Sequence, residues 1–414
     1  MNKISTLVLS ISILFSLHVG AQSTPCLLDA NGRYVLPDGS PCPNAIVTTV
    51  PFLTIAPDAR AGGMGDAGMA TSADANSLAY NDSKIVFAEE KMALTLSYVP
   101  WLRALGLQDI GMSYAGFYTK LDDRQAIGAS LRYFTLGSIE FLDIEGQSLG
   151  MGKPNEFEVK VAYARKLSEN FSAAIAPKFI FSDLASGQRT QDGGSGDLIK
   201  VGIAFAADIS VTYQKTIQTS FKRDVTFAAV LSNIGSKIAY TSTVADMLPA
   251  NIGIGYGWRA HLDEANTFLL TLDIRKLLVP TPRHQSDPEF DANNDGIADF
   301  RQLGTFEAIF GSFSDAPDGF AEELREITYS IGAEYWYDNQ FAVRLGYFYE
   351  NPLKGNRKFI TAGIGLKYNI FGINLSYLVP TNNLRNPLDN TLRFTLTFDF
   401  SKMGAGETAP AGDI

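Results

Sequence analysis

Two segments of this 414-residue chain carry residue types that could bind a ligand. The first, at 52–68, reads FLTIAPDARAGGMGDAG and places four glycines beside Asp58, Arg60 and Asp66. A glycine-rich turn of this kind cradles phosphate when it follows a buried strand and opens a helix. The surrounding residues do not alternate between strand and helix patterns, so the sequence argues against a phosphate site. It assigns these glycines to close backbone packing.

The second segment, DANNDGIAD at 291–299, has the spacing of a calcium-binding loop with a glycine at its sharp turn. Its oxygen donors would be Asp291, Asn293, Asp295, the backbone carbonyl of Ile297, and Asp299. Position twelve is Gln302 instead of the bidentate glutamate of a strong site, which weakens the match. A solvated acidic loop with an Asn-Asp-Gly turn is the alternative interpretation. No cofactor other than calcium is suggested by the sequence.

The N-terminal residues predict export. Residues 1–21 have the pattern of a signal peptide, with Lys3 before an apolar run and Val-Gly-Ala before Gln22. The chain's two cysteines, Cys26 and Cys42, flank a short loop. In an oxidising compartment a disulfide is favoured over free thiols, and a zinc site would need further ligands.

Charge and hydropathy exclude two further classes. The formal net charge is −10, and it becomes −11 when the leader with Lys3 is removed. Few cations are then available to neutralise phosphates, so nucleic acid is excluded as a partner. No segment reaches the ~18 consecutive apolar residues of a membrane-spanning helix.

The rest of the chain has the alternation of β-strands. In TLRFTLTFDF at 391–400 apolar residues take every second position, so one face meets an apolar medium and the other a polar space. We predict fourteen such strands, an even number, and most are long enough to cross a bilayer. They lie near 92–99, 108–119, 125–136, 155–166, 170–182, 198–214, 221–233, 249–260, 266–276, 326–338, 340–350, 358–369, 371–380 and 390–401.

The connections between these strands alternate between short and long. Links after strands two, four, eight, ten and twelve have a few residues, whereas links after strands three, five, seven, nine and thirteen are longer. An outer-membrane barrel has short periplasmic turns and longer external loops, whereas a soluble sandwich gives no reason for this phase. We therefore predict an all-β fold, a transmembrane antiparallel barrel over 92–401 with a flexible tail at 402–414, in contact with outer-membrane lipids.

The segment 22–91 precedes the first predicted strand and contains the glycine-rich stretch. We expect it to fold back as a plug, with 52–68 packed in or across the periplasmic mouth. Asp58, Arg60 and Asp66 would make polar contacts to the lumen, where Asp273 and Glu334 would balance Arg275 and Arg344. The plug glycines would be Gly62, Gly63, Gly65 and Gly68. A disordered linker is the alternative, but Phe52, Leu53, Ile55 and Met64 are more apolar than a linker needs.

Two external connections are more apolar than free loops need to be. After the first strand, Pro100, Trp101 and Leu102 would form a tip that dips into lipid or meets a partner. The longest connection, with a short helix expected near 318–326, carries Phe306, Ile309, Phe310, Phe313 and Phe320. We interpret both groups as candidates for partner binding; local packing across the barrel mouth is the alternative.

Several motifs resemble the PorV family of outer-membrane barrels, which is related to the FadL-type fatty-acid transporters. They are the stretch at 52–68, GSFSDAPDGFAEELREITYSIGAEYWY (311–337), GNRKFITAGIGLKY (355–368) and NPLDNTLRFTLTFDF (386–400). The resemblance covers about residues 50–401. One departure is Asn81-Asp82, where the family commonly has Asn-Pro, so the turn that proline fixes is in doubt.

The resemblance implies a bacterial outer-membrane component of the type IX secretion system with no active site. Such a barrel would bind a SprA-type translocon and receive cargo proteins through their C-terminal signal domain. It would deliver them to a cell-surface attachment complex with a PorU-type sortase. A FadL-type transporter of hydrophobic small molecules is the alternative function.

A surface enzyme such as a lipid hydrolase is a weaker third class. His18 leaves with the leader, and His261 and His284 fall in connections on opposite sides of the predicted barrel. A Ser-His-acid triad therefore has no histidine near both partners, and we predict that the protein is not an enzyme.

Overall fold

The computed structural model describes residues 26–28, 34–101, 109–142, 147–185, 187–188, 198–218, 222–242, 244–285, 287–381 and 391–400. The predicted leader (1–21), Leu102 and the tail (402–414) lie outside these residues. The chain divides into two compact units, Met1–Cys42 and Pro43–Ile414, which are described separately below. In the described part of the chain, no helix is both long enough and apolar enough to span a membrane.

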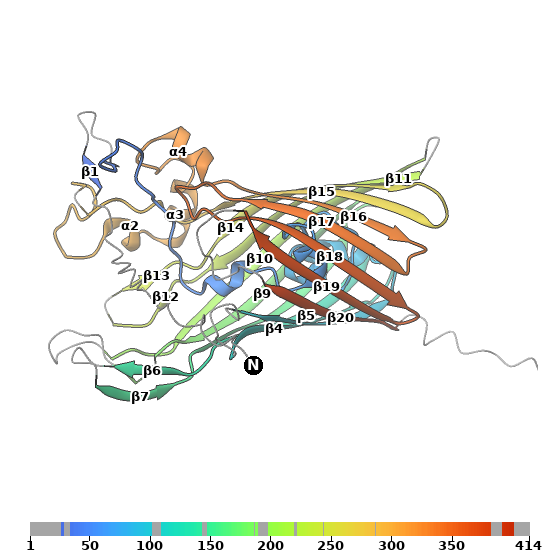
Figure 1. Cartoon of the computed structure of the whole chain (residues 1–414), viewed down its shortest axis with the longest axis horizontal. Coiled ribbons are helices and arrows are strands. Elements are labelled where there is room, and N and C mark those ends of the chain that lie inside the picture. The colour runs from blue at the N-terminus through green and yellow to red at the C-terminus, as the bar shows by residue number, and fades with distance from the viewer. Residues whose placement is uncertain are drawn as a thin grey trace, which may run out of the picture. The chain divides into compact units, whose positions relative to one another are not determined.

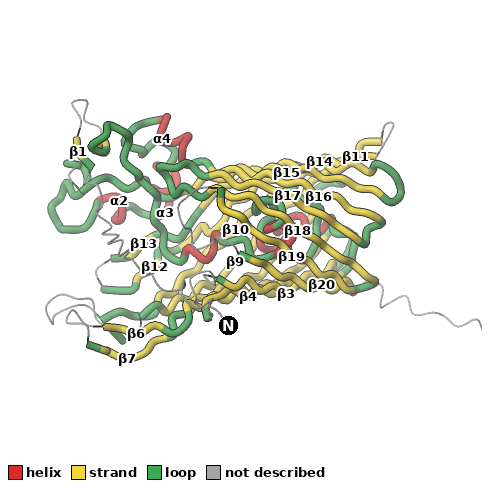
Figure 2. The backbone as a smooth tube through the Cα atoms, viewed as in Figure 1, coloured by secondary structure: helices red, strands yellow, loops and turns green. Residues whose placement is uncertain are grey.

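The second unit contains a closed antiparallel barrel of fourteen strands, as the alternation predicted (Figures 1 and 2). Each strand pairs with its neighbours along the chain, and the last strand pairs with the first to close the ring. The strands are β3 (Met92–Pro100), β4 (Ile110–Lys120), β5 (Gln125–Leu136), β8 (Asn155–Lys166), β9 (Phe171–Asp183), β10 (Gly202–Gln218), β11 (Lys222–Gly235), β14 (Asn251–His261), β15 (Asn266–Leu277), β16 (Thr328–Tyr337), β17 (Phe341–Tyr349), β18 (Lys358–Tyr368), β19 (Phe371–Pro380) and β20 (Leu392–Asp399).

The two faces of the barrel wall differ as the alternation requires. On β18, Ile360 and Ile364 are about half exposed on the outer face, whereas Thr361 between them is fully buried on the inner face. The same contrast recurs around the ring, so the wall presents an apolar surface outward and polar or small residues inward.

The two mouths of the barrel differ as well. One mouth carries the short turns, such as 121–124 between β4 and β5, and we call it the short-turn mouth. The other, the long-connection mouth, carries extra structure beyond the strands (Figure 1, left). This comprises the hairpin β6 (Ile139–Leu142) and β7 (Ser148–Gly152), the pair β12 (Ile238–Ala239) and β13 (Ala245–Asp246), and helices α2 (Asp299–Gln302), α3 (Thr305–Gly311) and α4 (Phe320–Arg325). The sequence predicted only the last of these helices.

The lumen holds four short helices that precede the barrel in the chain. They are η1 (Pro51–Thr54), α1 (Ala59–Gly62), η2 (Ala75–Ala79) and η3 (Asp82–Phe87), and most of their residues are buried. We call residues 51–88 the plug. Figure 1 shows its blue ribbon enclosed by the strands.

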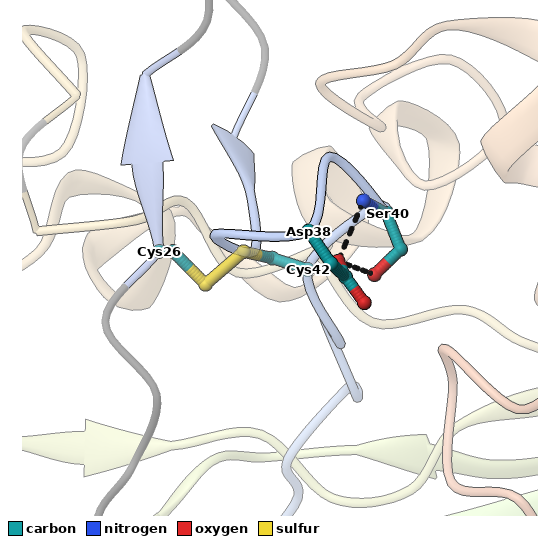
Figure 3. The surroundings of a disulfide bond; sticks show 4 residues. All are labelled: Cys26, Asp38, Ser40 and Cys42. Carbon is teal, nitrogen blue, oxygen red and sulfur yellow. Dashed lines mark hydrogen bonds between the residues drawn. A yellow bond between two sulfur atoms is a disulfide. The ribbon is translucent and has the colours of Figure 1, made fainter.

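The first unit is a small disulfide-closed loop. Cys26 and Cys42 form a disulfide with their Cα atoms 6.1 Å apart. The two-residue strands β1 (Leu27–Leu28) and β2 (Tyr34–Val35) pair within it. In the adjoining turn, Ser40 donates from its backbone N–H and its hydroxyl to Asp38 Oδ1, at 2.9 and 2.6 Å (Figure 3).

Candidate functional site

The plug fits the barrel wall because glycines face each other where the two backbones meet. An added Cβ at Gly346 on β17 would lie 2.0 Å from the amide nitrogen of Gly65. An added Cβ at Gly363 on β18 would lie 3.1 Å from the Cα atom of Gly63. Gly65 also has a φ of +67°, which favours glycine, and its N–H donates to Thr361 Oγ1 at 2.8 Å. The glycines of the wall therefore make room for the plug backbone.

Charged side chains then fasten the plug to the wall. The Arg60 guanidinium makes two bonds to the Glu334 carboxylate, at 2.7 and 2.9 Å, and Arg344 donates to the same carboxylate at 2.7 Å. Asp66 accepts from Arg393 at 2.7 Å. The three arginines and Glu334 are buried, so each of these charges depends on its partner for stability.

Backbone amides of the plug are also bound by the wall. Asp273 Oδ2 on β15 accepts from the N–H groups of Gly68 and Met69, at 2.8 and 2.9 Å. The same carboxylate oxygen lies 3.0 Å from Arg275 Nη2. Glu334 with Arg344, and Asp273 with Arg275, are thus the paired lumenal charges that the sequence suggested.

Two features of the plug differ from the prediction. The Asp58 carboxylate is hydrogen-bonded within the plug, where it accepts from Ala61 N–H and from the Tyr80 hydroxyl. The segment 52–68 also does not lie at the short-turn mouth. Phe52 packs in the cluster that includes Val99 and Leu248 at the long-connection mouth, and Gly63 lies against the middle of β18. Sequence patterns do not encode depth along a barrel, which is why the end was assigned wrongly.

The second half of the plug lies deeper and is fastened by lysines. Lys160 on β8 contacts Asp82 at 3.0 Å and Asp208 on β10 at 3.3 Å. Asp82, which stands where the PorV pattern has proline, thus supplies an ion pair to the wall. Lys84 is buried and donates to the Gly68 carbonyl and to Thr71 Oγ1, at 2.6 and 3.0 Å. Burial lowers the pKa of the Lys84 ammonium to about 8.

A cavity of about 590 Å³ lies between the plug and the long-connection mouth. One side of it is aromatic, with Trp101 against Phe134 at 5.2 Å and Phe348 stacked on Phe359 at 4.8 Å between ring centroids. The remaining lining mixes apolar residues with charged ones, which include Arg132, Glu158, Lys178, Arg357 and Arg393. The cavity is therefore amphipathic rather than uniformly apolar.

The connection 278–327, which we call the cap, is held down by buried ion pairs. Lys276 contacts Glu323 at 2.9 Å and also Glu326, while Lys354 contacts Glu322 at 2.5 Å and Glu326 at 3.0 Å. Thr281 donates to Glu326 at 2.6 Å. These contacts fix α4 relative to β15 and to the link after β17, so the cap is an ordered surface.

The cap exposes several of the predicted partner-binding phenylalanines. Phe306 and Phe310, one helical turn apart on α3, are 70% and 74% exposed. Phe313 is 50% exposed and Phe320 on α4 is 75% exposed. Ile309 is different, because it is buried in a cluster with Ala250 and Leu278 and serves the packing of the cap.

Pro100 and Trp101 of the predicted tip after the first strand do not project outward. Pro100 is buried, and Trp101 packs into the cavity against Phe134. Leu102 lies outside the described residues. Trp101 thus lines the cavity and Pro100 is covered, so both have the packing role that was the alternative interpretation.

In the calcium-like loop, the oxygens that would bind the metal accept hydrogen bonds from within the loop and from Gln302. Asp291 accepts from the N–H groups of Asp295 and Gly296, at 3.0 and 2.9 Å. The Gln302 amide nitrogen donates to both Asp295 oxygens, at 3.1 and 2.9 Å, and to the Ile297 carbonyl at 3.1 Å. The Ile297 N–H and the Gln302 amide lower the pKa of Asp295.

Asn293 and Asp299 also accept hydrogen bonds from backbone N–H groups of the loop. Asn293 Oδ1 accepts from the Asp295 N–H at 2.9 Å, and Asp299 Oδ2 accepts from the Ala292 N–H at 3.1 Å. Within the described residues, no three His, Cys, Asp or Glu side chains gather as metal ligands. Metal binding by this loop stays a prediction.

The histidine of β14 lies in a structural contact. His261 Nε2 lies 3.0 Å from Asp224 Oδ2, and Arg259 lies 2.8 Å from the same oxygen. Asp224 also accepts from the Thr216 hydroxyl at 2.7 Å. This group joins the starts and ends of neighbouring strands at the short-turn mouth.

A family model described as the Type IX secretion system protein PorV matches residues 41–284, more than half of the chain. The chain belongs to the PorV family. It is a bacterial outer-membrane protein and an outer-membrane component of type IX secretion. Because outer-membrane barrels have short periplasmic turns, the long-connection mouth faces the cell exterior. No curated protein matches the chain.

Solved structures similar to this PorV-family barrel have low sequence identity. The Pseudomonas putida toluene transporter TodX has 10% identity and a TM-score of 0.47, over 84% of this chain and 98% of that chain. The Ralstonia pickettii toluene transporter TbuX has 12% identity and a TM-score of 0.45, over 83% and 97%. A Pseudomonas aeruginosa FadL homologue has 11% identity and a TM-score of 0.43, over 87% and 100%.

Sequence reasoning missed the lysine network of this PorV-family barrel. Lys178 on β9 lies 2.9 Å from Asp208, which also contacts Lys160, and the three side chains come from neighbouring strands. The available signal was a charged residue at an inward position of an alternating strand, as Lys160 is in FEVKVAYAR. Their partners could not be read from the sequence, because pairing depends on strand register.

Proposed function

We propose that this protein binds a SprA-type translocon and receives cargo proteins through their C-terminal signal domains. It then passes them to an attachment complex with a PorU-type sortase. The observation that carries the proposal is the exposed phenylalanine surface of the cap. Phe306, Phe310 and Phe320 are each at least 70% exposed on an element held in place by buried ion pairs. An ordered apolar surface that faces the cell exterior supports contact with another protein.

The PorV-family match supports the same proposal, since it assigns the chain to type IX secretion. The plug also supports a role in binding cargo rather than conducting it. A lumen filled by residues 51–88 offers no open path for an unfolded chain, so cargo would be handled at the exterior mouth and not conducted through the barrel.

A second candidate function, transport of hydrophobic small molecules, is favoured by the cavity. Its aromatic side, formed by Trp101, Phe134, Phe348 and Phe359, could hold an apolar group. Against it stand the charged residues of the remaining lining and the plug below, which closes the way to the periplasm.

Deletion of the gene separates the two functions. We expect proteins with C-terminal signal domains to disappear from the cell surface and medium, with the uptake of fatty acids and toluene unchanged. Re-expression of the native chain should restore secretion. Normal secretion together with reduced uptake would instead support the transporter.

A further inference from the structure

The contacts of the plug show at which mouth of the barrel each of its ends lies. The first barrel strand, β3, starts with Met92 at the short-turn mouth. Just before it, the Ala88 and Glu90 carbonyls accept from Lys120 and Tyr118, at the end of β4 next to the turn 121–124. The plug therefore leaves the lumen on the periplasmic side.

Followed from residue 88 towards residue 51, the plug runs from the periplasmic mouth towards the exterior mouth. Leu78 and Ile85 pack among Ala126 and Ala164, near the short turns. Gly65 then meets Gly346 in the middle of β17, and Ala59 N–H donates to Thr395 Oγ1 in the middle of β20, at 2.8 Å.

At its start, the plug reaches the opposite mouth. Phe52 stacks on Phe134, near the end of β5, and Arg132 binds the carbonyls of Phe52 and Leu53 at 3.1 and 2.6 Å. The order of contacts from residue 52 to residue 91 thus follows the barrel from the exterior mouth to the periplasmic mouth.

The residues before the plug lie beyond the ends of the barrel strands, where they are bound to the long connections. Thr49 donates to the Met247 carbonyl from its N–H and its hydroxyl, at 3.2 and 2.8 Å. Asn44 donates to the Leu353 carbonyl at 2.7 Å, to the Pro282 carbonyl at 2.9 Å and to Glu322 at 3.1 Å. Val47 between them is 81% exposed. Residues 44–49 are therefore hydrogen-bonded to several long connections of the exterior mouth, including the cap.

We infer that the chain enters the barrel from the cell exterior and runs through the lumen towards the periplasm. Residues 44–49 are displayed at the exterior mouth, where they contact the long connections. This differs from the periplasmic position expected for the whole segment 22–91. The inference depends on the orientation of the barrel and not on which partner the cap binds.

Cysteine labelling in whole cells tests the inference. Val47→Cys would be placed in a Cys26→Ser, Cys42→Ser background and treated with a membrane-impermeant maleimide. Met151→Cys, 68% exposed on β7, is the exterior control, and Leu121→Cys, 55% exposed in a short turn, is the periplasmic control. We expect Val47→Cys and Met151→Cys to react in intact cells, and Leu121→Cys only after permeabilisation.

Labelling of Val47→Cys only after permeabilisation, or only after denaturation, would overturn the inference.

Discussion

The plug lies inside the lumen and the cap lies at its exterior mouth, and the two regions differ in how far their apolar side chains are covered. In the plug, Phe52, Met64, Leu78 and Ile85 are each fully buried. In the cap, Ala308 and Ile309 are buried while Phe306 and Phe310 on the same helix are exposed. Both regions are fastened by buried ion pairs, so order does not explain the difference. The apolar side chains of the plug are covered by the chain itself, whereas those of the cap remain available for contact with another molecule.

The largest effect expected from this comparison is at the glycine contact of the plug. Gly346→Val would place a side chain against the backbone of Met64 and Gly65 and displace the plug. We expect the barrel to fold, as judged by heat-dependent migration on gels. A cleared lumen of this width should raise single-channel conductance by about tenfold or more.

The matched control for this variant is Gly311→Val in the cap, where an added Cβ meets no atom within 4 Å. Its conductance should equal that of the native protein. If Gly346→Val forms a folded barrel with native conductance, the plug does not seal the lumen.

A smaller effect is expected at Lys84 inside the plug, on the pH dependence of the free energy of unfolding. Its folded-state pKa of about 8 lies below the ordinary value of 10.5, so the unfolded chain binds more protons between these two pH values. The free energy of unfolding should therefore rise with pH across that window, by an amount of the order of 3 kcal/mol for this group.

Urea unfolding at pH 8 to 10.5 measures this contribution when native protein is compared with Lys84→Met. All other titrating groups are common to both proteins, so the difference in slope belongs to Lys84. Parallel stability curves for the two proteins would mean that the burial of this ammonium has no energetic consequence.

The smallest effect is expected in the cap, at the calcium-like loop. Gln302 donates to the oxygens that would hold a cation, so any binding must displace its amide. We expect weak binding only, which stabilises the protein by about 1.4 kcal/mol when free calcium is ten times the dissociation constant. Thermal unfolding in detergent and proteolysis of 277–325 with added calcium provide the measurement.

Two variants decide whether this loop is a site. Gln302→Glu supplies a carboxylate at the twelfth position and should strengthen the response, whereas Asp291→Ala with Asp295→Ala should abolish it. If the double variant responds to calcium as the native protein does, calcium does not bind at this loop.

The wall of the barrel could be predicted from the sequence, and the interior only in part. Alternation along TLRFTLTFDF reports which side chains face lipid, because that environment acts on each strand locally. The apolar residues of 52–68 correctly indicated a packed segment. Its depth could not be predicted, since it depends on contacts such as Gly65 with Gly346, which are far apart in the chain.

Partner-binding residues were separable only in the structure. Trp101 and Phe310 both occupy external connections and look alike as sequence. Trp101 packs against Phe134, which lies on another strand, whereas Phe310 has no such cover and is 74% exposed. Whether an aromatic residue in a loop is core or surface depends on neighbours that periodicity does not place.

Site-specific crosslinking in secreting cells tests the contrast between plug and cap most directly. A photoreactive side chain at Phe310 should capture the SprA-type translocon or a cargo protein with a C-terminal signal domain. The matched control is Phe205, 65% exposed on the outer face of β10, which should meet lipid and capture neither. Absence of both adducts at Phe310, or the same adducts at Phe205, would contradict the cap as the contact surface.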